Sequence, residues 1–248
     1  PVFDYKRCLF EKVYVETPVD TDGDGRLDLI AVYIRRPLET TQGMRVPAIY
    51  VANPYMLECN EDWYVPHDVD RDVSPYPQQH ITESDITFDP STVSFPQPRY
   101  PRATVGYADT APTEEIPLDC ISDWYSYFNS RGYASVFCGG LGTRGSQGFN
   151  CCGSPEETAA FKAVIDWLNG RCRAFTNLTD NIEIRADWCT GKVAMSGKSY
   201  LGTMCIAVAS TGVEGLETII PEAAISNWYD YYRCNGLNLP AIGWQGDD

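Results

Sequence analysis

Residues 193–202 read VAMSGKSYLG, an apolar run followed by a Gly-Lys-Ser turn and the start of a small-residue segment. This order predicts a strand, a sharp bend and a helix, the setting in which α/β enzymes expose a serine nucleophile. Such a bend needs small neighbours, and Gly197 and Gly202 supply that room. We therefore expect the Ser199 hydroxyl to project above a sheet, beside helix N–H groups that begin with that of Tyr200.

Two other interpretations fit the same residues. A phosphate-binding loop has the pattern G-x-x-x-x-G-K-[ST], whose end matches residues 197–199, but position 192 should then be glycine and is Lys192. An ordinary strand-to-helix turn that contains a serine is the second. The nucleophile interpretation itself departs from the general G-x-S-x-G pattern, since Leu201 stands where the second glycine is expected.

The rest of the chain alternates strands and helices. Residues 13–15 and 29–34, joined by a turn at 20–25, predict an antiparallel hairpin at the sheet edge, and residues 48–52 predict a buried central strand. The remaining predicted elements are, in chain order, an amphipathic helix over about 121–130, a strand over 133–138, a helix from 154, a strand over 193–195, a helix over about 200–210 and a strand over 216–220. Together they predict one α/β domain with a mostly parallel sheet and flanking helices.

The helix that begins at Ser154 has the clearest signals. Ser154 and Glu157 form a capping-box pattern, Pro155 takes the first helical position, and Gly170 follows its end. Its predicted apolar face consists of Phe161, Val164, Ile165 and Leu168.

Two stretches have no such regularity. Residues 56–118 are rich in Pro, Asp, Ser and Tyr and predict a long surface excursion. From about residue 222 to 248 the pattern is aromatic and irregular, and we interpret it as the start of a cap or substrate-pocket region. The whole of 1–248 is then one partial catalytic domain, incomplete at its C-terminal side.

Composition excludes several classes of function. The formal net charge of −15 disfavours binding to nucleic acids and to anionic membranes, and no signal peptide or membrane-spanning run is visible, so we expect a cytoplasmic protein. Ten cysteines include no C-x-x-C pair, which disfavours zinc. Residues 20–28 copy the start of a calcium loop, but Ala31 replaces the glutamate at its twelfth position, and turn chemistry explains the pattern. We expect neither a metal nor a cofactor.

Longer motifs carry a family resemblance. Residues 142–146 (GTRGS), 163–170 (AVIDWLNG), 211–216 (TGVEGL) and above all 223–233 (AAISNWYDYYR), taken with 197–204, closely resemble the X-prolyl dipeptidyl aminopeptidases. These belong with the cocaine-esterase-like α/β-hydrolases. The resemblance extends from about Val13 to the end of the chain.

The resemblance implies a role for several residues. Ser199 corresponds to the nucleophile, and Tyr55, after the third strand, corresponds to a tyrosine that completes the oxyanion hole with the Tyr200 amide. Trp228 and Tyr231 correspond to aromatic walls of a proline pocket, and flat apolar walls suit a pyrrolidine ring.

Three further expectations follow from the resemblance. Asp247 falls where relatives hold the substrate's free amine, although they tend to carry glutamate there. The implied substrates are peptides with a penultimate proline, and the implied full-length assembly is a homodimer. A cocaine-esterase-type acyl hydrolase is the alternative activity.

The rest of the triad is the main departure. In this fold the order along the chain is serine, acid, histidine, yet His67 and His80 both precede Ser199. A serine hydroxyl without a base is a poor nucleophile at neutral pH. We therefore expect the triad aspartate and histidine to come after Asp248, with His67 or His80 as the alternative base, and we expect the isolated chain to be inactive.

Overall fold

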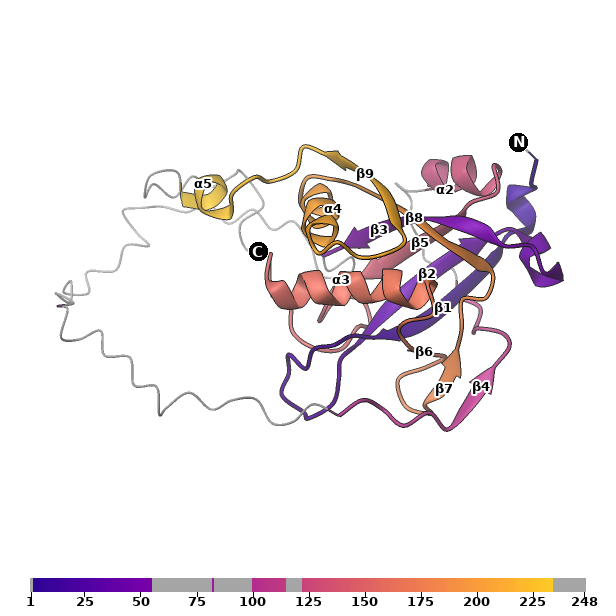
Figure 1. The fold of residues 1–248 in the computed structure, drawn as a ribbon, viewed down its shortest axis with the longest axis horizontal. Helices are drawn as coiled ribbons and strands as arrows, with labels where there is room; N and C mark the ends of the chain where they lie inside the picture. Colours follow the sequence, from indigo (N-terminus) through magenta and orange to yellow (C-terminus); the bar gives the residue numbers. More distant parts are fainter. Residues whose placement is uncertain (1, 55–81, 83–99, 115–121, 234–248) are drawn as a thin grey trace, which may run out of the picture.

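The computed structural model describes residues 2–54, 82, 100–114 and 122–233. A twisted sheet forms its centre, with helices packed against it (Figure 1). The strands of the sheet are β1 (Leu9–Glu16), β2 (Leu29–Arg36), β3 (Val46–Asn53), β4 (Gly106–Ala108), β5 (Ala134–Gly139), β6 (Ala174–Phe175), β7 (Ile182–Ile184), β8 (Cys189–Lys198) and β9 (Leu216–Glu222).

The strands lie in the order β4-β7-β6-β1-β2-β5-β3-β8-β9. Pairing is parallel from β5 through β3 and β8 to β9, and antiparallel through β6, β1, β2 and β5, so the sheet is mixed. The predicted central strand is confirmed, because β3 lies between β5 and β8. In such sheets ligands bind at the carboxyl ends of the parallel strands. The carboxyl end of β8, at Lys198, is therefore where a site is expected.

The predicted hairpin forms, but its position at the sheet edge was wrong. β1 pairs with β2 from Leu9↔Arg36 to Glu16↔Leu29, and each strand has a second neighbour, β6 for β1 and β5 for β2. Residues 29–34 are buried on both faces of the sheet, as an internal strand requires. The short strands β6, β7 and β4 extend the sheet beyond the hairpin.

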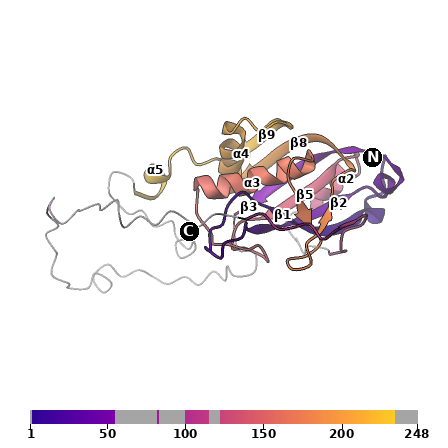
Figure 2. The same ribbon diagram turned by 60° about the horizontal axis from the view of Figure 1, so that its bottom comes forward.

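The helical elements are η1 (Tyr5–Arg7), η2 (Leu38–Gln42), α2 (Ser122–Asn129), α3 (Pro155–Leu168), α4 (Tyr200–Ser210) and α5 (Trp228–Arg233). The helices α3 and α4 pack against each other and against the same face of the sheet (Figure 2). In β5 the side chains of Ala134 and Val136 point into the core under α3 and α4. Because side chains alternate along a strand, Ser135 between them points to the other face, where it donates to Asn129 at the end of α2. The sheet is therefore covered on both sides.

The start of α3 differs from its prediction in one respect. Ser154 caps the helix by accepting the Glu157 N–H, and Gly170 ends the segment with φ +73°. In a full capping box the Glu157 carboxylate would accept the Ser154 N–H, but that N–H donates to the Cys151 carbonyl. The predicted apolar face is buried as expected. Glu157 is also buried, and its carboxylate is used elsewhere.

Part of the predicted excursion is ordered against the sheet. Residues 106–108 form β4, which pairs with β7, and the Arg102 N–H donates to the Glu16 carboxylate at 2.8 Å. The rest of that stretch, residues 56–81, 83–99 and 115–118, lies outside the described residues. Within the described residues, no helix combines the length and the apolar character that a membrane crossing requires.

Candidate active site

Ser199 occupies the predicted bend. β8 ends at Lys198 and α4 begins at Tyr200, and between them Ser199 adopts φ +60° and ψ −123°. Its N–H donates to the Glu222 carbonyl of β9 at 2.8 Å, and its own carbonyl accepts the first helical bond of α4, from Thr203 N–H at 2.9 Å. A non-glycine residue at positive φ is strained and persists only where its surroundings fix it. Both ends of this residue are fixed in that way, and the side chain remains partly exposed.

Gly197 and Gly202 make the bend possible by allowing close approach. A Cβ on Gly197 would lie 2.5 Å from the Leu201 Cβ, and one on Gly202 would lie 2.7 Å from the Glu222 carbonyl oxygen. Gly202 therefore lets α4 approach β9 closely, and Leu201 does not need to be glycine. The prediction that these two glycines provide room for the bend is confirmed.

The phosphate-loop interpretation was wrong. Lys192, at the position that needed glycine, lies within the extended strand β8, where a phosphate-binding loop would require a Gly-rich turn. Lys198 is exposed and forms an ion pair with Glu222 at 3.4 Å. No loop wraps around a phosphate position in this part of the described chain.

The first turn of α4 supplies hydrogen-bond donors beside Ser199. The first backbone N–H groups of an α-helix have no acceptor within the helix, and they point toward its N-terminus. The Tyr200 N–H is the first of these in α4. The helix dipole adds partial positive charge at the same point. If the Ser199 hydroxyl attacked a carbonyl group, the negative charge on the carbonyl oxygen would develop next to this partial positive charge.

The Tyr200 side chain takes part in a separate, buried network. Its hydroxyl donates to Glu157 Oε2 at 2.6 Å, while the Gly153 N–H donates to the Tyr200 hydroxyl at 2.8 Å and to Glu157 Oε2 at 2.9 Å. Burial, and then the nearby Glu157 carboxylate, raise the pKa of the Tyr200 phenol far above its usual value. The phenol therefore stays protonated as a donor. Sequence reasoning noticed Glu157 only as a capping residue and missed this contact.

Trp228 and Tyr231, the two predicted pocket aromatics, lie together on α5. The Trp228 ring meets Tyr200 edge to face, with centroids 4.9 Å apart, and meets Tyr231 in the same way at 6.3 Å. A second connection runs from Thr203, whose hydroxyl accepts the Ile225 N–H at 2.8 Å and donates to the Ser199 carbonyl at 3.1 Å. The first turn of α4 thus contacts both the predicted nucleophile and the segment that carries the aromatic pair.

Tyr55 and Asp247, the other two predicted site residues, lie outside the described residues. The end of β3 is described up to Pro54. Parallel pairing sets Tyr50 opposite Met195, and counting on from that pair brings Asn53 level with Lys198. β3 therefore ends beside the bend that carries Ser199.

The acidic turn at residues 20–28 shows the chemistry expected of a turn. The Asp20 carboxylate accepts the Gly23 and Gly25 N–H groups at 2.8 and 3.0 Å, and Gly23 and Gly25 have φ of +75° and +85°. Carboxylate oxygens of Asp20, Asp22 and Asp28 lie within 4.8 Å of one another. Because the backbone and Thr21 already use the oxygens of Asp20 and Asp28, we assign no ion here.

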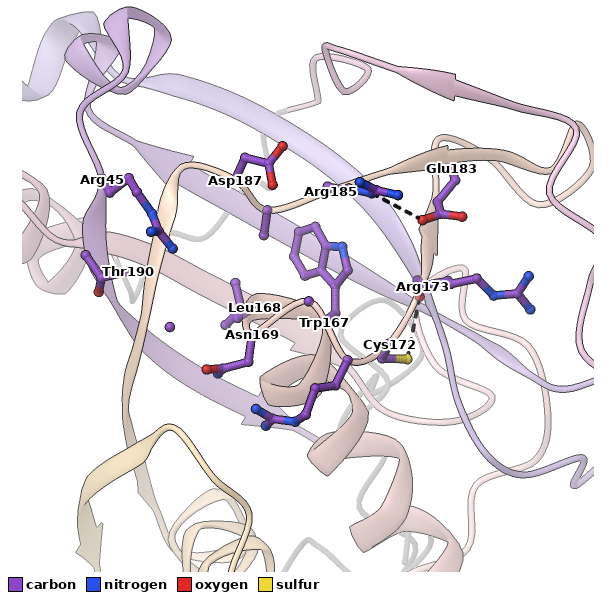
Figure 3. A pocket seen from close by; sticks show the side chains of 14 residues that line it. Arg45, Trp167, Leu168, Asn169, Cys172, Arg173, Glu183, Arg185, Asp187 and Thr190 are labelled. Carbon is purple, nitrogen blue, oxygen red and sulfur yellow. Dashed lines mark hydrogen bonds and ion pairs between the residues drawn. The ribbon is translucent and has the colours of Figure 1, made fainter.

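A basic cavity of about 730 Å³ lies at the opposite end of β8 (Figure 3). It is lined by Thr190 and Gly191, roughly 25 Å along the strand from Ser199 at the usual rise per residue. Its arginines bond to the protein itself: Arg45 donates to the Cys189 carbonyl and Arg173 to Glu16. This cavity is separate from the Ser199 bend.

The thiols described do not form disulfides. Cys138, Cys189 and Cys205 are buried and free, as expected for cysteines within apolar runs, and burial raises the pKa of Cys205 to about 12. Cys151 and Cys152 do not form a disulfide either, and the Cys152 thiol lies beside Tyr200.

Comparison with known proteins places this architecture in a family. A model described as X-Pro dipeptidyl-peptidase (S15 family) matches residues 22–247. Xaa-Pro dipeptidyl-peptidases from Pediococcus pentosaceus and Lactobacillus helveticus are 45% and 44% identical over 100% of this chain and 30% of their own length. This chain therefore spans about 30% of the length of these curated relatives.

A solved structure shows the same fold. The crystal structure of a CocE/NonD family hydrolase from Staphylococcus aureus matches with a TM-score of 0.50 at 16% identity, covering 90% of this chain and 29% of that one. At that identity the likeness concerns the fold, which is that of the α/β-hydrolases. Because the family model matches residues 22–247, which are most of this chain, the chain belongs to the X-Pro dipeptidyl-peptidase (S15) family.

Proposed function

We propose that this chain is the nucleophile-bearing part of a serine exopeptidase that releases X-Pro dipeptides from peptide N-termini. The observation that carries the proposal is the strained, partly exposed Ser199 between β8 and α4. Relatives 44–45% identical over the whole chain bear the name Xaa-Pro dipeptidyl-peptidase, which supports this substrate class over simple esters.

The reaction would proceed through an acyl-enzyme. Ser199 Oγ attacks the carbonyl carbon of the proline residue, its proton passes to a base, and the oxyanion is held by the Tyr200 N–H and the Tyr55 hydroxyl. The leaving amine takes that proton as the peptide bond breaks. Water then attacks the ester, releases the X-Pro dipeptide and restores the serine.

Recognition would depend on the aromatic pair of α5. The edge-to-face contact between Trp228 and Tyr231 forms an apolar corner, and a proline ring has no N–H that such a wall would leave unpaired. We assign Asp247 to the substrate's free amine. The net charge of −15 favours a cationic N-terminus over an anionic ligand.

The base and its orienting acid would lie outside these 248 residues. His67 and His80 are the histidines of the chain, and both precede Ser199, opposite to the order of this fold. The proposal therefore concerns a longer polypeptide, which we expect to be a cytoplasmic homodimer.

The test uses that complete polypeptide. Wild type should release Gly-Pro from a Gly-Pro-p-nitroanilide substrate faster than it hydrolyses a simple acyl ester, and a fluorophosphonate should label Ser199. Ser199→Ala should lower kcat by at least about 10³-fold, because the nucleophile itself is removed. Labelling at another residue, or activity that survives in S199A, would contradict the proposal. The isolated 248-residue chain should show no Ser199-dependent turnover.

A further inference from the structure

The Glu157 carboxylate has no role in the mechanism above, yet it is held beneath the nucleophile's helix. Glu157 is 2% exposed and lies in the first turn of α3, where the helix dipole favours a negative charge. A buried carboxylate is costly unless it is hydrogen-bonded. Here Oε2 accepts two bonds, from the Tyr200 hydroxyl and the Gly153 N–H.

These bonds fix the residue that follows the nucleophile. Tyr200 provides the proposed oxyanion donor through its backbone and reaches Glu157 through its side chain, so rotation of the first turn of α4 would break the 2.6 Å bond. Charge-assisted bonds of this kind are short and strong. The side-chain bond thus restrains the direction of the backbone N–H.

The same bonds fix the aromatic wall. Trp228 packs edge to face on Tyr200, and a Cβ on Gly153 would lie 2.4 Å from the Trp228 Nε1. Gly153 and Tyr200 therefore form the surface on which the indole rests, and Glu157 bonds to both of them.

We propose that Glu157 is a positioning residue, which holds Tyr200 and Gly153 so that the Ser199 bend and the Trp228 ring keep a fixed relation. This inference rests on the proposed function for the role of Trp228, but not for the geometry of Ser199. It predicts that loss of the carboxylate impairs two properties together, the reactivity of Ser199 and the binding of proline.

The experiment compares variants of the complete polypeptide by the rate at which a fluorophosphonate labels Ser199. Glu157→Ala and Tyr200→Phe should each slow labelling roughly tenfold, as expected for one charged hydrogen bond. Glu157→Gln keeps an acceptor oxygen and should stay within about threefold of wild type. Glu156→Gln, an exposed neighbour in the same turn, is the matched control and should label at the wild-type rate.

Substrate kinetics provide the second readout. E157A and Y200F should lower kcat and raise KM for Gly-Pro-p-nitroanilide, while KM for p-nitrophenyl acetate, which has no proline ring, should change little. A purely structural role would lower the melting temperature without changing the labelling rate of the folded protein. Should E157A fail to fold, Y200F decides, because it removes a single oxygen from a ring of the same shape.

The outcomes separate the two proposals. Wild-type labelling rates in folded E157A or in Y200F would overturn the role of Glu157, whatever the substrate. Absence of X-Pro release by the wild type would overturn the proposed function, and the labelling comparison would still measure the effect of Glu157.

Discussion

Two bends of this chain use glycine for different physical reasons. In the turn at residues 20–25, Gly23 and Gly25 themselves adopt positive φ, and an added Cβ would meet nothing within 4 Å. At the Ser199 bend the positive φ belongs to the serine itself. Its neighbours Gly197 and Gly202 are required because other atoms approach their Cα closely.

The difference shows how strain can be assigned to function. In the first bend, glycine takes the unusual backbone angles at little cost, and the Asp20 carboxylate accepts the N–H groups of both Gly23 and Gly25. In the second, a serine takes angles it disfavours, and the surrounding strand and helix hold it there. A turn that only reverses the chain can place glycine at such a position, as the turn at residues 20–25 does.

The largest effect is expected from filling the space at Gly202. Gly202→Ala would set a Cβ 2.7 Å from the Glu222 carbonyl oxygen and 2.9 Å from that of Gly197. Because both are backbone atoms, α4 must move away from β9, at a cost of about 3 kcal/mol in the free energy of unfolding. Denaturant unfolding measures this cost. Ser210→Ala, at the exposed end of the same helix, is the control and should change stability by less than about 0.5 kcal/mol.

Relieving the strain at Ser199 should have the opposite sign. Ser199→Gly removes a penalty of about 1–3 kcal/mol for the backbone angles and adds about 0.5–1 kcal/mol for the freedom of glycine in the unfolded state. We expect a net gain of about 1 kcal/mol in denaturant unfolding, with loss of fluorophosphonate labelling. A destabilised S199G would show that the bend is not strained.

At Gly25 the same comparison predicts a loss. Gly25→Ala keeps φ near +85° with no clash, so the cost is the backbone preference alone, about 1 kcal/mol. Gly25→Asn should cost less, since asparagine tolerates these angles. Neither change should affect the labelling of Ser199. A cost at Gly25 as large as that of G202A would remove the distinction between the two bends.

The local elements could be predicted where periodicity and turn residues agree. α3 and α4 begin where expected, and the apolar face of α3 is buried. The short strands β6 and β7 were missed, because two or three residues carry no periodicity. β6 makes β1 an internal strand, as β5 does for β2. The sequence could not show this for β1, because an inner strand resembles an edge strand when its neighbour is too short to predict.

The part of the candidate site that depends on local sequence could be predicted, and the part that depends on distant contacts could not. Gly197, Ser199 and Gly202 follow from local geometry, which the sequence carries directly. The contact of Glu157 with Tyr200 joins residues 43 positions apart, and the local capping pattern pointed Glu157 to the wrong partner. Roles that depend on packing between distant segments are not encoded in the spacing of residues.

The smallest effect concerns Asp28, at the end of the acidic turn at residues 20–28. Burial raises the pKa of this carboxyl above its ordinary value, against the bonds from the Thr21 N–H and hydroxyl. The folded state therefore binds the proton more tightly than the unfolded state, and the stabilisation is greatest below the ordinary value of 3.8 and is lost as pH rises through the folded pKa.

Asp28→Asn should flatten that decline, because the amide stays neutral while its oxygen can still accept from Thr21. Melting temperatures from pH 4 to 7 measure the difference between the two proteins, and it should grow in favour of D28N as pH rises. Parallel curves would show that the Thr21 bonds balance the effect of burial, and a difference that moves in favour of wild type as pH rises would show that they outweigh it. Stabilisation of wild type by added calcium, absent in D28N, would show instead that the carboxylates of this turn hold an ion, and the turn would then differ from the Ser199 bend in ligand chemistry as well as in backbone geometry.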